Sequence, residues 1–175
     1  MKLILVEDAA TRAAASELLE EYLRWIARVA QQSYGLSIDV AAMVDSDLND
    51  PAKFYPPSGR FYVLRHEDGH VGIGALKQLA PGVAEIQRMY VRPQVRGTGA
   101  GRRLVERLLD DAKASGYHAV RLESLRALVA AHTLYRSVGF VESAPYAKNS
   151  MEHYQPAADM ERYRASAVFM EKKLA

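Results

Sequence analysis

The sequence predicts a single α/β domain, residues 1–175, with a mixed β-sheet, and three observations support this. The chain length of 175 residues falls within the range of about 100–200 residues that one domain usually takes. Residues 61–91 contain strand-forming runs separated by turn residues. On either side of them, segments with helical spacing alternate with further strand-like runs, an order that is typical of α/β proteins.

The N-terminal third of the chain predicts one strand and two helices. A short strand is expected over residues 2–7. Apolar side chains then recur at helical spacing, which predicts an amphipathic helix that starts at Asp8 or Thr11 and runs to about Gln31. A second, shorter helix is expected over residues 38–48, where an Asn-Asp-Pro sequence stops it.

The middle of the chain predicts three antiparallel strands, and the rest alternates helices with strands. Asp68 and Gly69 are expected to form the first hairpin turn, and a Pro-Gly pair the second. The expected elements are, in chain order, strands 61–64, 71–79 and 83–91, a helix to Ser115, a strand 118–123, a helix 127–138, and strands 139–143 and 167–172.

The composition excludes several classes of protein. Because there are no cysteines, disulfides, thiolate metal sites and a cysteine nucleophile are impossible. A net charge of +2 is too balanced for a general nucleic-acid partner. No apolar run approaches the roughly 18 residues that cross a bilayer, and the first residues meet an acidic pair too early for a signal peptide. We therefore expect a cytoplasmic protein without a membrane partner.

One motif suggests zinc, but its context argues against a metal site. His66 and His70 match the pattern H-E-x-x-H, which binds zinc when a helix places both histidines on one face. Here Asp68 and Gly69 break the chain between two strands. We therefore predict no metal.

The most informative segment is a glycine-rich turn between a strand and a helix. Glycines let the backbone approach an anion, and the first turn of a helix offers unpaired N–H groups, so a phosphate or pyrophosphate fits there. Arg102 stands where a P-loop needs lysine and where a dinucleotide fingerprint needs its last glycine, so neither nucleotide motif is present. The alternative is a turn that only starts a helix. The turn consists of Arg96, Gly97, Thr98, Gly99, Ala100, Gly101 and Arg102.

Two blocks of sequence resemble the GNAT acyltransferase superfamily. Residues 96–101 match its acetyl-CoA signature, Arg/Gln-x-x-Gly-x-Gly/Ala, and residues 131–140 match its pattern Ala-x-x-Leu-Tyr-x-x-x-Gly-Phe. The resemblance is strongest over residues 60–143. It implies the GNAT acyltransferase fold, in which a mixed, mostly antiparallel sheet of about seven strands is flanked by helices and splayed at the acyl-CoA site.

The resemblance also implies an activity. Backbone N–H groups of the glycine-rich turn would hold the pyrophosphate of acetyl-CoA, and pantetheine would lie along the strand at Met89, Tyr90 and Val91, where a free N–H can polarise the thioester oxygen. The acetyl group would pass directly, in a ternary complex, to a primary amine of a small molecule. The alternatives are acetylation of a lysine or N-terminus of a protein or peptide, and a non-catalytic acyl-CoA-binding module.

Two catalytic residues are expected. Tyr135 stands where the family keeps its tyrosine acid, and a phenol with a pKa of ~10 can protonate the leaving thiolate; the alternative is a tyrosine that only packs in the core. Glu85 is the candidate base that deprotonates the amine, directly or through water, and the alternative is a solvated strand glutamate. Period two would place Glu85 on one strand face with Val83, Gln87, Met89 and Val91.

Residues 143–165 carry no clear motif. They can form an exposed connection with one short helix, a segment that closes over a substrate, or a subunit contact. The sequence leaves open whether the chain forms a homodimer.

Overall fold

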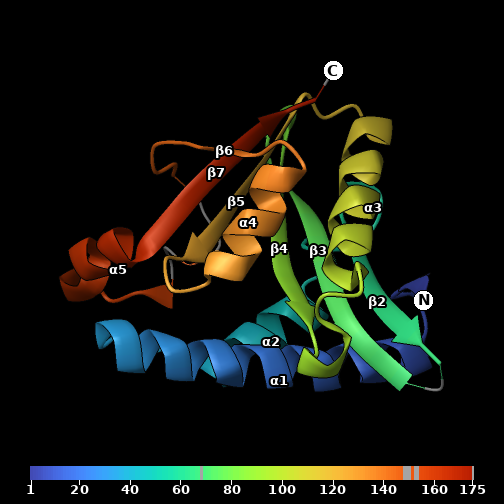
Figure 1. Cartoon of the computed structure of the whole chain (residues 1–175), viewed down its shortest axis with the longest axis horizontal. Coiled ribbons are helices and arrows are strands. Elements are labelled where there is room, and N and C mark those ends of the chain that lie inside the picture. Colours follow the sequence, from blue (N-terminus) through green and yellow to red (C-terminus); the bar gives the residue numbers. More distant parts are fainter. Residues whose placement is uncertain (68, 148–150, 152–153, 175) are drawn as a thin grey trace.

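A mixed β-sheet runs through the protein (Figure 1). The computed structural model describes residues 1–67, 69–147, 151 and 154–174, and within these residues the sheet has seven strands in the order β1-β2-β3-β4-β5-β7-β6. β4 and β5 are parallel, whereas the other neighbouring pairs are antiparallel. The strands are β1 (Lys2–Leu5), β2 (Arg60–His66), β3 (Gly69–Ala80), β4 (Val83–Val91), β5 (Ala119–Leu125), β6 (Val141–Glu142) and β7 (Ala167–Lys173).

Helices cover both faces of this sheet (Figure 1). α1 and α2 pack on one face of β2 to β4, and α3 and α4 share the core on the other face. The predicted α/β fold is therefore confirmed. The helices are α1 (Ala9–Tyr34), α2 (Val40–Asn49), α3 (Ala100–Ala114), α4 (Val129–Ser137) and α5 (Met160–Ser166), with 3-10 turns η1 (Pro93–Val95) and η3 (Ala157–Asp159).

The long helix α1 begins where its sequence predicts and continues past the predicted end near Gln31 to Tyr34. The Asp8 side chain caps it, because Thr11 N–H donates to Asp8 Oδ1 at 2.7 Å and so satisfies an otherwise unpaired donor of the first turn. Gly35 ends the helix with φ 65°, the left-handed conformation that glycine adopts without strain. Leu18, Leu19 and the other apolar residues of one stripe are buried against the sheet.

The sheet opens between β4 and β5. The two strands are paired only at residues 83–86 of β4 and 119–122 of β5. Beyond this point they diverge (Figure 1), so β4 has an unpaired edge over residues 87–91. This is the predicted splay, and it leaves room for a ligand between the strands.

β4 also contains a bulge at Arg88. Ile73 of β3 lies opposite Tyr90, and Ala75 lies opposite Gln87, so two steps along β3 correspond to three along β4. Arg88 has φ 55°, which is uncommon for a residue other than glycine. Such a bulge bends a strand and changes which face its later side chains occupy.

The bulge overturns the predicted common face of the β4 side chains. Ile86, Met89 and Val91 contact the core under α3, whereas Tyr90 belongs to the core under α1. Because Glu85 alternates with Ile86, it points to the opposite face from Met89 and Val91. The strand alternates as predicted on each side of Arg88, but the alternation shifts by one residue there.

The C-terminal connection packs more closely than an exposed loop. In the described part of residues 143–165 the short helix α5 begins at Met160, and Tyr163 of this helix is buried in a small core with Ala30 and Phe169. Of the predicted first hairpin turn, Asp68 lies outside the described residues. Among the residues that are described, no helix has the length and apolarity that crossing a membrane requires.

Candidate active site

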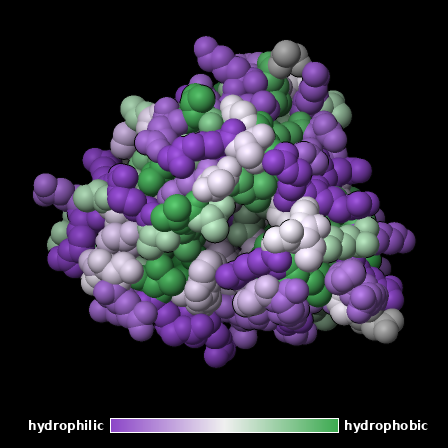
Figure 2. All heavy atoms as spheres, viewed as in Figure 1, coloured by the Kyte–Doolittle hydropathy of each residue, from purple (hydrophilic) through white to green (hydrophobic). Residues whose placement is uncertain are grey.

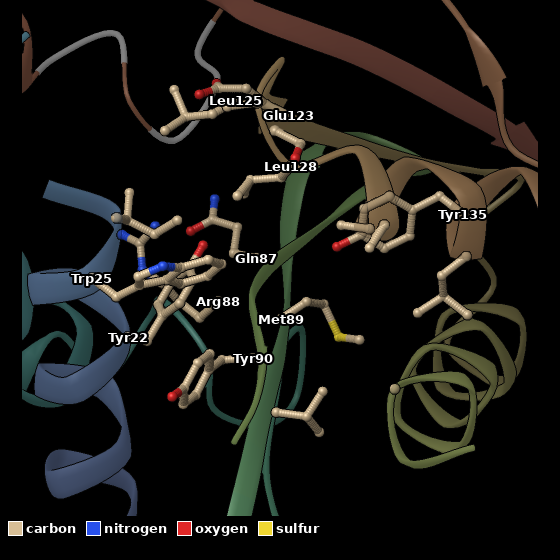
Figure 3. A pocket seen from close by; sticks show the side chains of 18 of the residues that line it. Tyr22, Trp25, Gln87, Arg88, Met89, Tyr90, Glu123, Leu125, Leu128 and Tyr135 are labelled. Atoms are coloured by element: carbon tan, nitrogen blue, oxygen red, sulfur yellow. The ribbon is translucent and has the colours of Figure 1, made fainter. Parts of the chain in front are cut away.

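A cavity of about 600 Å³ lies where β4 and β5 diverge (Figure 3). Its walls come from α1, the last half of β4, the glycine-rich turn, the end of β5, and α4. Figure 2 shows apolar side chains around the middle of this face of the molecule, where the surface is hollowed. The cavity therefore joins the segments that the two sequence motifs single out.

The glycine-rich turn forms one end of this cavity and has the geometry of an anion site. Gly97 and Gly99 have φ of 79° and 88°, and a Cβ on either would have no atom within 4 Å. The turn therefore faces open space. Gly99 precedes α3 and offers no side-chain cap, so the first N–H groups of the helix, at Ala100, Gly101 and Arg102, have no acceptor within the helix. Unpaired N–H groups and the helix dipole favour a phosphate at this position.

The side chains of the turn bind to protein groups. Arg96 Nε donates to the carbonyl oxygen of Val91 at 3.1 Å, and the guanidinium lies 5.2 Å from the ring centroid of Trp25. Arg102 pairs with Glu106 at 3.2 Å and donates to Ser137 Oγ at 2.8 Å. The hydroxyl of Thr98 donates to the carbonyl of residue 95 at 2.7 Å. The backbone N–H groups of the turn are therefore the groups that remain available to an anion.

We expect Gly99→Ala to raise the dissociation constant of acetyl-CoA by about tenfold or more, equivalent to ~1.4 kcal/mol. An alanine at φ 88° is strained, and its Cβ projects into the open space before α3. Isothermal titration calorimetry measures the change. Gly116→Ala is the matched control, because Gly116 has φ 79° and equally open surroundings but follows α3. An equal loss of affinity in both variants would contradict the prediction that the glycine-rich turn binds acetyl-CoA.

The predicted pantetheine strand lies along one wall of the cavity. Met89, Tyr90 and Val91 all line it, and their backbone groups belong to the part of β4 that β5 does not cover. The Tyr90 hydroxyl donates to Glu21 at 2.6 Å. Burial and this hydrogen bond raise the pKa of Tyr90 to about 12, so the phenol stays protonated and holds β4 to α1.

Tyr135 lies on the opposite wall, on α4. It is 7% exposed, and its hydroxyl points into the cavity toward β4 (Figure 3). Its ring packs edge-on to Phe140 at 6.0 Å between centroids, so the residue combines core packing with access to the cavity. Burial raises the pKa of Tyr135 above its ordinary value. The hydroxyl therefore keeps its proton near neutral pH and can donate it.

Glu85 lies behind the cavity wall. Its side chain is 0% exposed, which makes the interpretation as a solvated glutamate wrong. It accepts hydrogen bonds from Gln87 Nε2 and, at 2.9 Å, from the Tyr146 hydroxyl. Burial raises the pKa of the Glu85 carboxyl. Gln87 lines the cavity, but Glu85 does not, so the role of Glu85 as base stays a prediction.

The structure adds three polar residues that the sequence analysis missed. Glu123 of β5 lines the cavity (Figure 3), and so do Gln87 and Gln155. Glu123 stands at the end of a predicted strand, which marks it as a possible site residue. The sequence does not place it at the cavity, because the divergence of β4 and β5 is known only from the structure. For Gln155 the sequence offers no signal. In the part of the chain that is described, no group of three or more metal-ligating side chains occurs.

A buried ion cluster supports the bulge of β4. The Arg88 guanidinium binds both carboxylate oxygens of Asp47, through Nε and, at 3.2 Å, through Nη2. Lys53 binds the same carboxylate and also contacts Ser46 Oγ at 3.0 Å. All three charged side chains are at least nine-tenths buried. α2 and the loop after it therefore anchor the residue at which β4 changes direction.

Comparison with known proteins agrees with this geometry. A family model described as an acetyltransferase (GNAT) domain matches residues 57–142. An uncharacterized N-acetyltransferase of Schizosaccharomyces pombe is 34% identical over 134 residues, which cover 75% of this chain and 77% of that protein. The chain belongs to the GNAT acetyltransferase family. The predicted family and enzyme class are thus confirmed, and the expectation of acetyl-CoA as co-substrate agrees with them.

Other GNAT proteins support the same fold. The IAA acetyltransferase of Azospirillum brasilense is 29% identical over 143 residues, which cover 81% of this chain and 86% of that protein. A putative acyl-CoA N-acyltransferase from Klebsiella pneumoniae superposes with a TM-score of 0.69 at 25% identity, over 99% of this chain and 97% of that one. A putative acetyltransferase of Salmonella typhimurium, solved with its cofactor acetyl-CoA, superposes with a TM-score of 0.65 at 18% identity, over 99% and 94% of the two chains.

Proposed function

We propose that this GNAT enzyme transfers the acetyl group of acetyl-CoA to a primary amine of a small molecule. One observation carries the proposal: a single cavity brings together the uncapped start of α3, the unpaired edge of β4 and the hydroxyl of Tyr135. The related structure from Salmonella typhimurium, which contains acetyl-CoA, supports the choice of co-substrate.

In this proposal each wall of the cavity has one task. The N–H groups at the start of α3 bind the pyrophosphate, and the edge of β4 binds the pantetheine arm by adding it as a further strand. A backbone N–H beside Arg88 would stabilise the oxyanion that forms when the amine attacks the thioester carbon. Tyr135 would donate its proton to the departing thiolate sulfur. The chain has no cysteine, so the acetyl group passes directly to the amine nitrogen.

The size of the cavity favours a small acceptor. Its volume of about 600 Å³ is within the range of ordinary small-molecule sites. The pantetheine arm would take a large part of this space, because it enters along β4. A folded protein can therefore present only a side chain or a terminus there, whereas a small amine fits completely.

Glu85 and Glu123 are the two carboxylates that can accept the proton of the ammonium group. Burial moves the pKa of Glu85 upward, toward the range in which a base is effective near neutral pH, but Glu85 would have to act through water past Gln87. Glu123 lines the cavity itself. For this reason we propose Glu123 as the second candidate base, beside Glu85.

The pH dependence of two variants distinguishes these carboxylates. Without the base, the reaction depends on amine that is already deprotonated, and with a pKa of ~10.4 this fraction falls tenfold for each unit of pH decrease. We expect Glu123→Gln to lower kcat/KM most strongly at low pH, with a smaller and more even loss for Glu85→Gln. Steady-state rates between pH 6 and 9 measure this. A larger loss at low pH in Glu85→Gln than in Glu123→Gln would establish Glu85 as the base. If the pH profile is unchanged in both variants, neither carboxylate is the base.

Release of free thiol from acetyl-CoA tests the proposed function. Acetyl-CoA at 100 times its dissociation constant should stabilise the fold by about 2.7 kcal/mol and raise the melting temperature by roughly 5–10 °C. A panel of small primary amines should then accelerate thiol release more than peptides with a lysine or a free N-terminus. Release with peptides alone would indicate a protein acetyltransferase. Stabilisation without release over the whole panel would indicate a binding module.

A further inference from the structure

We propose that the acceptor is a primary amine on an apolar body that carries no carboxylate, and that it binds between α1 and β4. This inference rests on the proposed function and names the acceptor class of the same cavity. We call this part of the cavity the amine chamber. It is lined by Tyr22, Trp25, Ile26, Ile38, Met43 and Tyr163, together with the polar residues Gln87, Glu123 and Gln155.

The wall of the amine chamber is largely aromatic and aliphatic. Tyr22 and Trp25 project from α1 toward β4 (Figure 3). Their rings lie 6.3 Å apart between centroids, and each lies within about 6 Å of the Tyr90 ring. Met43 of α2 and Tyr163 of α5 are almost fully buried and close the chamber. Such a wall gains free energy by removing an apolar ligand surface from water.

Two buried amide oxygens in the chamber lack a donor. Gln87 and Gln155 are 5% and 8% exposed, and within the described part of the chain the Oε1 atom of each is buried without a hydrogen-bond partner. The Gln87 amide cannot simply rotate, because its Nε2 donates to Glu85. A buried acceptor without a partner is unfavourable, so a ligand that brings a donor within reach of either oxygen would bind more tightly.

A primary amine supplies these donors. An ammonium group has three N–H donors and a free amine has two, and either can reach acceptors on more than one side. The Glu123 carboxylate on the chamber wall adds a negative charge that favours the ammonium form on entry. Gln87 is two residues before Met89, on the unpaired edge of β4. An amine near Gln87 therefore lies close to the strand that would hold the thioester.

Two of the three arginines of the cavity are paired with a carboxylate, and the third is held by a backbone carbonyl and an aromatic ring, which argues against a carboxylate on the acceptor. Three arginines line the described cavity. Arg88 binds both oxygens of Asp47, Arg96 donates to a backbone carbonyl and stacks on Trp25, and Arg102 binds Glu106 and Ser137. A carboxylate in the amine chamber would thus be desolvated with no counter-ion other than Arg96, which already contacts a backbone carbonyl and the Trp25 ring.

A pair of substrates that differ only by a carboxylate tests this inference. 2-Phenylethylamine and phenylalanine have the same ring and the same primary amine. We expect kcat/KM for 2-phenylethylamine to be at least about tenfold higher, as measured by thiol release at saturating acetyl-CoA. Equal rates or a preference for phenylalanine would overturn the inference while leaving the proposed function intact. If no amine of the panel releases thiol, the proposed function fails and this inference fails with it.

Gln155→Leu tests the amide oxygens directly. We expect this variant to raise KM for 2-phenylethylamine by about tenfold, without a change in the dissociation constant of acetyl-CoA. Because the variant removes a buried acceptor that has no partner, its melting temperature should not fall. Gln32→Leu, on the exposed side of α1, is the matched control and should change none of these values. An unchanged KM in Gln155→Leu would overturn the role of this oxygen.

Discussion

Replacing Asp47 by alanine is expected to lower the free energy of unfolding by about 3–5 kcal/mol. Asp47 is 0% exposed and is the carboxylate that both Arg88 and Lys53 bind. Without it, two buried cations lose their counter-ion and repel each other, which is the most costly way to break a buried ion pair. For a chain of this size the loss corresponds to a fall in melting temperature of roughly 6–20 °C.

Urea denaturation followed by circular dichroism measures this change. Asp45→Ala is the matched control, because Asp45 lies on the same helix but is exposed, and it accepts a hydrogen bond from Asn49. We expect the control to lose less than about 1 kcal/mol. A loss of similar size in both variants would show that the ion cluster does not stabilise the fold.

The same cluster links stability to activity. Arg88 has a left-handed backbone with φ 55°, a conformation that persists in a residue other than glycine only when the surroundings hold it. Asp47 fixes the side chain of this residue from α2. Asp47→Asn keeps the shape of the side chain but also removes its charge, so it should be destabilised as well. The folded fraction of this variant should lose turnover, because the backbone N–H groups after Arg88 are held less firmly.

Much of the fold can be predicted from local signals in the sequence. The Asp8 cap and Gly35 fix the ends of α1, and both act within a few residues of the chain. The glycine-rich turn is visible for the same reason, since its function depends on the backbone of consecutive residues. Tyr135 is identified because residues 131–140 match a ten-residue sequence pattern of the GNAT family.

The rest of the site depends on contacts between distant segments. The bulge at Arg88 interrupts the two-residue alternation of side chains along β4, and no residue type in this strand predicts it. Tyr146 binds Glu85 from 61 residues away, and Asp47 binds Arg88 from 41 residues away. Neither pair lies within one helix or hairpin, so periodicity carries no information about them. For this reason the sequence identifies Glu85 as a carboxylate of interest but cannot show that it is buried behind Gln87.

Tyr135→Phe is expected to lower kcat by about 10²–10³-fold, because general acid catalysis typically contributes this much. The Tyr135 hydroxyl points into the cavity (Figure 3), and burial raises its pKa above 10.0. Burial would raise the pKa of the departing thiol in the same direction, so the pKa values of donor and acceptor would stay close enough for proton transfer. The dissociation constant of acetyl-CoA should not change, since the start of α3 and the edge of β4 are untouched.

The pH dependence of the wild-type enzyme adds a second test of Tyr135. Because its pKa is raised, the phenol stays protonated at every pH below about 10, and it should cause no alkaline loss of kcat in that range.

Tyr62→Phe is the matched control for Tyr135→Phe. Tyr62 is also a buried phenol, bound to Arg107 at 3.0 Å, but it does not line the cavity. Stopped-flow thiol detection separates the acetyl-transfer step from product release. A transfer rate in Tyr135→Phe equal to that of Tyr62→Phe would show that the thiolate takes its proton from water.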